Sequence, residues 1–231
     1  MDDRLGTHVA AVAALDEPTR RRLYDYVTRQ PGAVGRDDVA GAVGLARATV
    51  AFHLDRLVEE GLLDVRHERR SGRSGPGAGR PSKLYYRSAR QVAVSLPERH
   101  YDLAGHLLAT AIEAADGSGG SARAELDRRA RVVGEEMGRD CARDAPEGTE
   151  NTGIVLHALE SQGFEPRTPD DRVLLGNCPF HRLAKQHTEL VCGMNLSLLG
   201  GLLDGLGVVS LRADLDPLPD HCCVQLKPVS D

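Results

Sequence analysis

The feature that most constrains the fold of this chain is the order of three segments between Ala46 and Arg87. The first, ARATVAFHLDRLVEE, repeats apolar residues at the i, i+4, i+7 and i+8 spacing of one helix face. Gly61 then stops the helix, and a run rich in glycine and arginine leads to the aromatic sequence KLYYR. A helix that runs directly into a basic hairpin predicts a recognition helix followed by a β-wing.

Two shorter helical patterns precede this segment and complete a helix-turn-helix. Asp16 is placed to cap the first helix, with Pro18 in its first turn. Asp37 or Asp38 begins the second helix, and Gly44 supplies the turn after it. The elements expected after this turn are a helix over 46–60, a strand over 62–66, a loop over 71–81 and a return strand over 83–87.

The charge of the chain is divided unevenly along its length. The formal net charge is −5, which alone argues weakly against binding to nucleic acid. Residues 1–90 nevertheless carry 16 basic and 12 acidic side chains, whereas residues 91–231 carry 13 and 22. Eight basic side chains and one acidic side chain fall within residues 66–90. This local basic stripe is the electrostatic footprint that binding to phosphates requires.

The predicted recognition helix and wing supply candidate DNA contacts. Arg47 is suited to guanine O6 and N7, and Thr49 to a thymine methyl group or a phosphate. The wing arginines are suited to neutralising phosphates, and the wing glycines allow close approach to the duplex. The alternative is that the helix arginines form a solvated face and that the wing is a loop without a binding partner. In this alternative His53 is a structural surface residue. The candidates are Arg47, Thr49, His53 and Arg56 on the helix and Arg69, Arg70, Arg73 and Arg80 in the wing.

The patterns predict a mainly α protein with an α+β C-terminal domain. We expect a winged helix-turn-helix over 1–92, a helical dimerisation region over 93–146 and a small α+β sensor domain over 147–231. The helices of the middle region are expected over 97–116 and 122–143, separated by the flexible sequence DGSGGS. In the last domain we expect helices over 152–163 and 180–206 and strands over 172–175, 208–213 and 222–226.

The role expected for the five cysteines depends on the cellular compartment of the protein. The N-terminal sequence MDDRLGTHVA lacks the hydrophobic run of a signal peptide, and no apolar stretch approaches the roughly 20 residues that span a bilayer. We therefore expect a cytoplasmic protein without a membrane partner, in which structural disulfides are uncommon. The cysteines then indicate either burial as small apolar residues, or metal or redox chemistry.

Three of the cysteine sites fall in the last domain. Cys178 is predicted between a strand and a helix, where the helix start favours a thiolate, and His181 lies close to one turn further on. Cys192 would lie about 21 Å from Cys178 on an unbroken helix, so a shared site requires a break, for which His187-Thr188 is a candidate.

The doubled cysteine near the C-terminus leaves the third ligand open. Cys222 shares the apolar face of the predicted strand with Val224 and Leu226, whereas Cys223 lies on the polar face. Cys222 is therefore the favoured third ligand. Three thiolates with His181 suit Zn²⁺, and three thiolates with a weaker or external ligand suit an iron–sulfur cluster.

Residues 15–87 resemble the winged helix-turn-helix of ArsR-type bacterial regulators in LDEPTRRRLYDYV, ATVAFHLDRLVEEGLL and GRPSKLYYR. Residues 151–228 resemble the C-terminal domain of the regulators that include the Suf-operon repressor, in NCPFHRLAKQHTELVCGMN and CCVQL. The resemblance implies a repressor whose DNA affinity depends on an iron–sulfur cluster held by Cys178, Cys192 and Cys222 or Cys223. The chain departs from that pattern in having no extra cysteine close to Cys192 and a doubled cysteine at the end, and Cys141 lies outside it.

These observations favour a homodimeric, non-enzymatic transcriptional regulator that binds a double-stranded operator. A thiol or metal-dependent enzyme would use Cys178 as nucleophile and His181 as base, but the sequence shows no orienting acid. A regulator with a pocket for an organic ligand is the other alternative. Its lining would be Leu196, Leu198, Leu199, Leu202 and Leu203, which are more often core residues.

Overall fold

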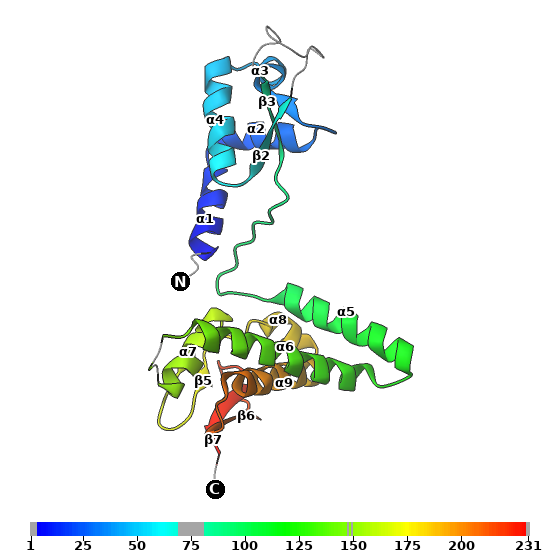
Figure 1. The fold of residues 1–231 in the computed structure, drawn as a ribbon, viewed down its shortest axis with the longest axis vertical. Helices are drawn as coiled ribbons and strands as arrows, with labels where there is room; N and C mark the ends of the chain where they lie inside the picture. The colour runs from blue at the N-terminus through cyan, green and yellow to red at the C-terminus, as the bar shows by residue number, and fades with distance from the viewer. Residues whose placement is uncertain (1–3, 69–80, 147, 149, 230–231) are drawn as a thin grey trace. The chain divides into compact units, whose positions relative to one another are not determined.

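The computed structural model describes residues 4–68, 81–146, 148 and 150–229, and the chain forms two compact units, residues 1–94 and 95–231 (Figure 1). Within the described residues of the N-terminal unit, four helices surround a three-stranded antiparallel sheet with the order β1-β3-β2. These elements are α1 (Arg4–Ala14), α2 (Pro18–Thr28), β1 (Val34–Gly35), α3 (Arg36–Val43), α4 (Arg47–Glu59), β2 (Leu63–Glu68) and β3 (Ser82–Arg87).

Local sequence signals explain the boundaries of these helices. Glu17, rather than the predicted Asp16, caps α2, because its carboxylate accepts hydrogen bonds from the backbone N–H groups of Thr19 and Arg20. Gly44 ends α3 in the left-handed conformation, with φ of 68°, which suits glycine. The apolar stripe of α4 is fully buried at three of its four predicted positions. Val50, Leu54 and Leu57 are each 0% exposed, whereas Val58 is partly buried and packs against the same core.

The described part of the C-terminal unit combines five helices with two short antiparallel strand pairs, β4–β5 and β6–β7. An isolated bridge between Val173 and Leu226 joins the β5 region to β7. The elements are α5 (Tyr101–Ser118), α6 (Ala122–Asp144), α7 (Asn151–Ser161), β4 (Pro166–Arg167), β5 (Leu174–Leu175), α8 (His181–Gln186), α9 (Thr188–Leu206), β6 (Leu211–Leu215) and β7 (Val224–Pro228).

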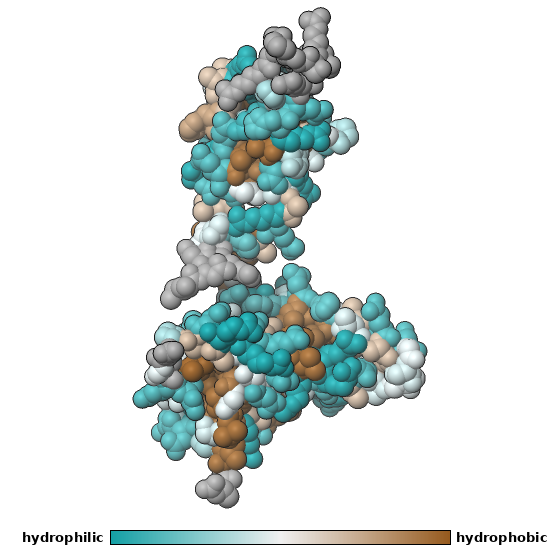
Figure 2. Space-filling view, viewed as in Figure 1, coloured by the Kyte–Doolittle hydropathy of each residue, from teal (hydrophilic) through white to brown (hydrophobic). Residues whose placement is uncertain are grey.

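The helices α5 and α6 are part of the C-terminal core and do not form a separate middle region. Leu107 of α5 and Leu126 of α6 are each 1% exposed and share one buried cluster with Leu198 and Leu202 of α9. The apolar faces of α5 and α6 therefore have a partner within the chain. Figure 2 shows that hydrophilic residues cover most of the visible face of each unit, with hydrophobic residues emerging in limited patches.

Four glycines let the backbones of α6 and α9 touch. A Cβ at Gly134 would overlap the carbonyl oxygen of Leu198, and a Cβ at Gly201 would overlap that of Arg131. Gly138 and Gly205 make the equivalent contacts one turn further along each helix. Both helices thus carry a Gly-x-x-x-Gly pattern on the contact face, and only glycine permits this approach.

The long helical stretch expected over 180–206 is broken at His187, which confirms the predicted break. His187 has φ of −135° and ψ of 54°, ends α8 and precedes α9. By length and composition α9 is apolar enough to cross a membrane, contrary to the expectation from sequence. Half of its most apolar window is buried inside the unit, and core helices of soluble proteins have the same composition.

We predict that Gly201→Ala destabilises the C-terminal unit by about 3 kcal/mol, because the new methyl group would meet backbone that cannot move aside as a side chain can. Gly105→Ala in α5 is the matched control. Nothing lies within 4 Å of its Cβ position, so alanine should stabilise the helix slightly. Thermal and urea unfolding of both variants measures the difference, and equal stability would show that α6 and α9 are not in close contact.

Candidate nucleic-acid interface and cysteine centre

The first half of α4 presents an exposed face formed by Arg47, Ala48, Thr49 and Phe52. The opposite face of the helix packs into the core of the N-terminal unit. In a helix-turn-helix, the N-terminal residues of the second helix contact base edges in the major groove. This face therefore holds two of the predicted contacts, Arg47 and Thr49, together with an aromatic side chain that the candidate list lacked.

Both helix arginines have acidic neighbours. The Nε of Arg47 lies 2.6 Å from Oδ1 of Asp37, and both side chains remain more than half exposed. Arg56 forms ion pairs with Glu59 and Glu60 at the C-terminal end of α4. A DNA phosphate or base must compete with these carboxylates, and exposed ion pairs of this kind are weak enough to exchange.

His53 faces α2 rather than open solvent. Its side chain is only 13% exposed, and Nδ1 lies 3.6 Å from a carboxylate oxygen of Glu17. Although burial opposes ionisation, the hydrogen bonds from the N–H groups of Thr19 and Arg20 lower the pKa of Glu17 to about 2. The carboxylate near His53 is therefore negative at neutral pH. This burial argues against the predicted DNA contact from His53 and favours its structural alternative.

The return strand of the wing is tied to the recognition helix through Asp55. Tyr85 on β3 donates a hydrogen bond of 2.9 Å to Oδ1 of Asp55, and Lys83 forms an ion pair with the same oxygen. Although burial opposes ionisation, these two partners lower the pKa of Asp55. Burial and the bond to Asp55 raise the pKa of Tyr85. The four predicted wing contacts lie outside the described residues. They are Arg69, Arg70, Arg73 and Arg80.

We predict that Asp55→Ala lowers the stability of the N-terminal unit by about 1 kcal/mol, since it removes the partner of Lys83 and Tyr85. The pKa of Asp55 is lowered on folding, so its contribution is present above its ordinary pKa of 3.8 and is lost as pH falls below it. Unfolding curves of wild type and variant should therefore converge in acid. A gap that persists well below that pH would mean that Asp55 does not act through its charge.

Four cysteine thiols from three segments interact in the C-terminal unit. Cys178 follows β5, Cys192 lies on α9, and Cys222 and Cys223 directly precede β7. Backbone pairing fixes two of these segments together, because the N–H of Cys222 donates to the carbonyl of Leu175 at 2.8 Å. The prediction that Cys178, Cys192 and Cys222 share a site, with Cys223 possible, stays a prediction, and these thiols lie near enough to shift one another's pKa values.

The thiols interact mainly as two pairs. A hydrogen bond from Cys222 lowers the pKa of the Cys178 thiol, and the same bond, with burial, raises the pKa of Cys222. Burial, with a hydrogen bond to Cys223, raises the pKa of Cys192 to about 12. Cys178 is therefore the group most readily ionised among the three. Within the described residues, no group of three or more His, Cys, Asp and Glu side chains is arranged to hold a single metal ion.

Asn195 on α9 is a residue of this centre that sequence reasoning missed. It is 1% exposed, and its Nδ2 donates to the sulfur of Cys222 at 3.3 Å. Its Oδ1 is buried without a hydrogen-bond partner among the described residues. An unsatisfied buried amide costs free energy, so its position beside the thiols indicates a polar centre rather than simple core. The available signal was an asparagine inside the otherwise apolar segment LVCGMNLSLL.

The remaining possible ligand is His181, and the remaining cysteine is Cys141, which was expected to lie outside the site. His181 begins α8 with an exposed side chain, and burial, with the charges of Lys185 and Arg99, lowers its pKa. Cys141 on α6 contacts Ser161 at 3.9 Å and does not act on the other thiols.

The loop that carries Cys178 also holds the start of the C-terminal unit. The guanidinium of Arg99 donates to the carbonyl of Cys178 at 3.3 Å and to the side chain of Asn177. The N–H of His100 donates to the carbonyl of Pro179 at 3.2 Å, and Nδ2 of Asn177 donates to the carbonyl of Glu98. Residues 98–100 are thus bonded to the segment around Cys178, a few positions after the boundary between the two units.

The leucines that would line an organic-ligand pocket are core residues. Leu198, Leu199, Leu202 and Leu203 are at most 3% exposed and share the buried cluster of the C-terminal unit, and Leu196 packs against it. Their spacing on α9 is explained by this packing. The structure therefore gives the pocket alternative no support from these residues.

Comparison with known proteins identifies the N-terminal fold. Residues 15–66 match the family described as a helix-turn-helix domain. No curated protein and no solved structure gave a match. The matched residues run from the end of α1 through α2, α3 and α4 into β2, and they include the exposed face of α4. The match supports a regulator of the ArsR or winged-helix type and indicates a DNA-binding transcriptional regulator.

Proposed function

We propose that the protein is a homodimeric, cytoplasmic repressor whose operator affinity is set by an iron–sulfur cluster on its C-terminal cysteines. The single observation that carries this proposal is that four thiols interact in a unit joined to a helix-turn-helix. They belong to Cys178, Cys192, Cys222 and Cys223. Three of these thiols would hold the cluster, and the fourth, or His181, would complete it. The cluster would supply sensitivity to oxidants, nitric oxide or iron loss.

A donor set of several thiols suits an iron–sulfur cluster, and it also suits a zinc ion. A tetrahedral Zn²⁺ needs its ligand atoms about 2.0 to 2.3 Å from one centre. A cluster binds its thiolates on different iron atoms, which lets the sulfurs stand further apart. Asn195 fits the same group, because its N–H already donates to the sulfur of Cys222 and hydrogen bonds to sulfur tune such centres.

A route from this centre toward the DNA-binding unit runs through residues 98–100. Any shift of the Cys178 loop acts on Arg99 and His100 through the hydrogen bonds that join them. These residues begin the segment before α5, and α5 and α6 are the helices we propose for the dimer interface. Ile112 and Val132 are 53% and 42% exposed there. Half-site spacing on a palindromic operator would depend on the geometry of this interface.

We predict that protein purified without oxygen is brown, with absorbance near 400 nm, and that Cys178→Ser removes the colour while Cys141→Ser keeps it. Both variants keep the helix-turn-helix, so only Cys178→Ser should change operator affinity. Elemental analysis separates the alternatives. Colourless protein with one tightly held zinc per chain would contradict the cluster and favour a zinc site. Colourless, metal-free protein that loses free thiols on oxidation would favour a thiol switch between the observed pairs.

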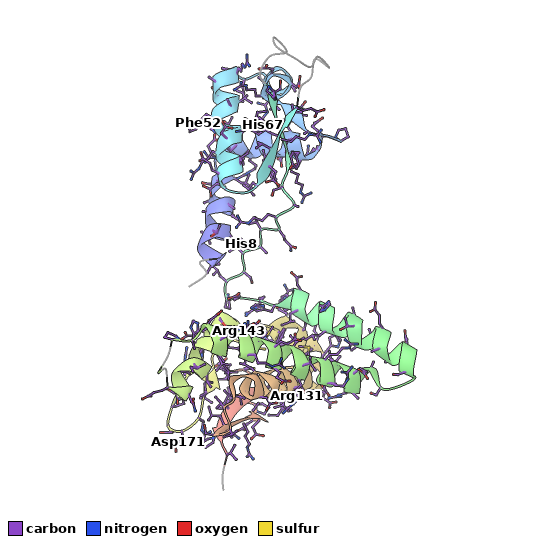
Figure 3. All side chains as sticks on the ribbon, in the orientation of Figure 1. His8, Phe52, His67, Arg131, Arg143 and Asp171 are labelled. Carbon is purple, nitrogen blue, oxygen red and sulfur yellow. The ribbon has the colours of Figure 1, made fainter. Side chains whose placement is uncertain are left out.

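We predict that Arg99→Met keeps the cluster but weakens its effect on DNA binding at least several-fold, because it removes the bonds to Asn177 and to the carbonyl of Cys178. Arg143→Met is the control, since the side chain of Arg143, labelled in Figure 3, is 73% exposed, and its ion pair within the described residues is with Asp140 of the same helix. Operator affinity is measured for the loaded and the cluster-free form of each variant. An unchanged ratio in Arg99→Met would show that this contact transmits nothing.

A further inference from the structure

Phe52 differs from the other phenylalanines of the chain. The sequence contains three, and Phe164 and Phe180 are buried at 2% and 1% exposure. Phe52 is 65% exposed and projects from α4, where Figure 3 labels it. A single exposed apolar residue is common on protein surfaces and needs no explanation by itself. The position of Phe52 gives it significance, because it lies in the exposed first half of α4, one turn after Thr49.

The neighbours of Phe52 on α4 extend the apolar surface. Ala48 lies four residues earlier and Thr49 three residues earlier, so both are adjacent to Phe52 on a helix, and both are exposed. Their methyl groups and the phenyl ring form a small apolar patch in the first half of the helix. This patch lies at the level where a recognition helix contacts base edges.

The phenyl ring is also supported from within the domain. It meets the ring of His53 edge to face, with centroids 5.2 Å apart and an angle of 68° between the planes. His53 is itself mostly covered and lies beside the carboxylate of Glu17. His53, which supports the phenyl ring, is thus held against α2. The contact already restricts the motion of Phe52, so Phe52 loses less conformational freedom on binding.

In the major groove, a phenyl ring can contact apolar groups favourably but cannot form hydrogen bonds with polar base edges or phosphates. It has no donor or acceptor for base edges or phosphates, and the one apolar group that base edges display in the major groove is the C5-methyl group of a pyrimidine. We propose that Phe52, with Ala48 and the methyl group of Thr49, reads C5-methyl groups in the operator. The patch would favour thymine over cytosine and would also contact the methyl group of 5-methylcytosine. This proposal rests on DNA binding by α4 but not on any cluster.

The test uses the full-length protein and a duplex that it selects from a random-sequence library. Each thymine of that duplex is replaced in turn by deoxyuridine, which removes only the methyl group. Wild-type protein should lose affinity about four-fold at one or two positions, the value of one buried methyl group. Phe52→Ala should bind the parent duplex more weakly and show no penalty for deoxyuridine at those positions. Val209→Ala is the control, because Val209 is 87% exposed on the other unit.

A second arm separates the two sources of the methyl group. At the sensitive position, a duplex with 5-methylcytosine should bind wild-type protein more tightly than the same duplex with cytosine, and Phe52→Ala should bind the two equally. The proposal that Phe52 reads a methyl group is overturned if no deoxyuridine substitution lowers affinity for the selected duplex. It is also overturned if Phe52→Ala keeps the full penalty for deoxyuridine. Either result leaves the DNA-binding proposal intact. Failure to select any duplex would overturn the DNA-binding proposal as well.

Discussion

The backbone contact between α6 and α9 is the interaction on which the C-terminal unit depends. Glycines on both helices remove the side chains that would separate them, so the two longest helices of the unit pack directly together. Because α9 carries Cys192 and Asn195, this contact also fixes where one wall of the cysteine centre stands. The centre is then completed by strand pairing, which brings Cys222 to Leu175 and leaves Cys178 at the end of β5.

Helical spacing predicted the recognition helix to within one residue at each end, since its apolar stripe and Gly61 are local signals. The first helix escaped prediction, because RLGTHVAAVAA has no acidic residue in its first turn and no basic residue in its last turn. Helical periodicity also cannot predict the contacts of a residue that lies beside the apolar stripe. His53 contacts Glu17, which lies in another element, and no spacing within α4 indicates that contact.

The cysteine centre, like the recognition helix, could be predicted only in part from the sequence. Residue types and a candidate break at His187 were visible in the sequence, so Cys178, Cys192 and Cys222 could be predicted to share a site. Which thiols form pairs depends on the register of β5 against the segment before β7, and that is a long-range property. Asn195 was overlooked because an amide on a helix is common, and only its burial at 1% exposure distinguishes it.

The anchoring of Asp55 has a consequence for engineering. Residues that hold α4 in place and residues that face outward occupy different sides of one helix. Asp55 serves the first role through Lys83 and Tyr85, whereas Thr49 and Phe52 are exposed. A library that varies the outward positions and retains Asp55 would therefore change the target preference of the domain without altering how its helix and wing are joined. The sequence of α4 separates these two roles residue by residue, which makes the domain a suitable scaffold for reprogrammed operators.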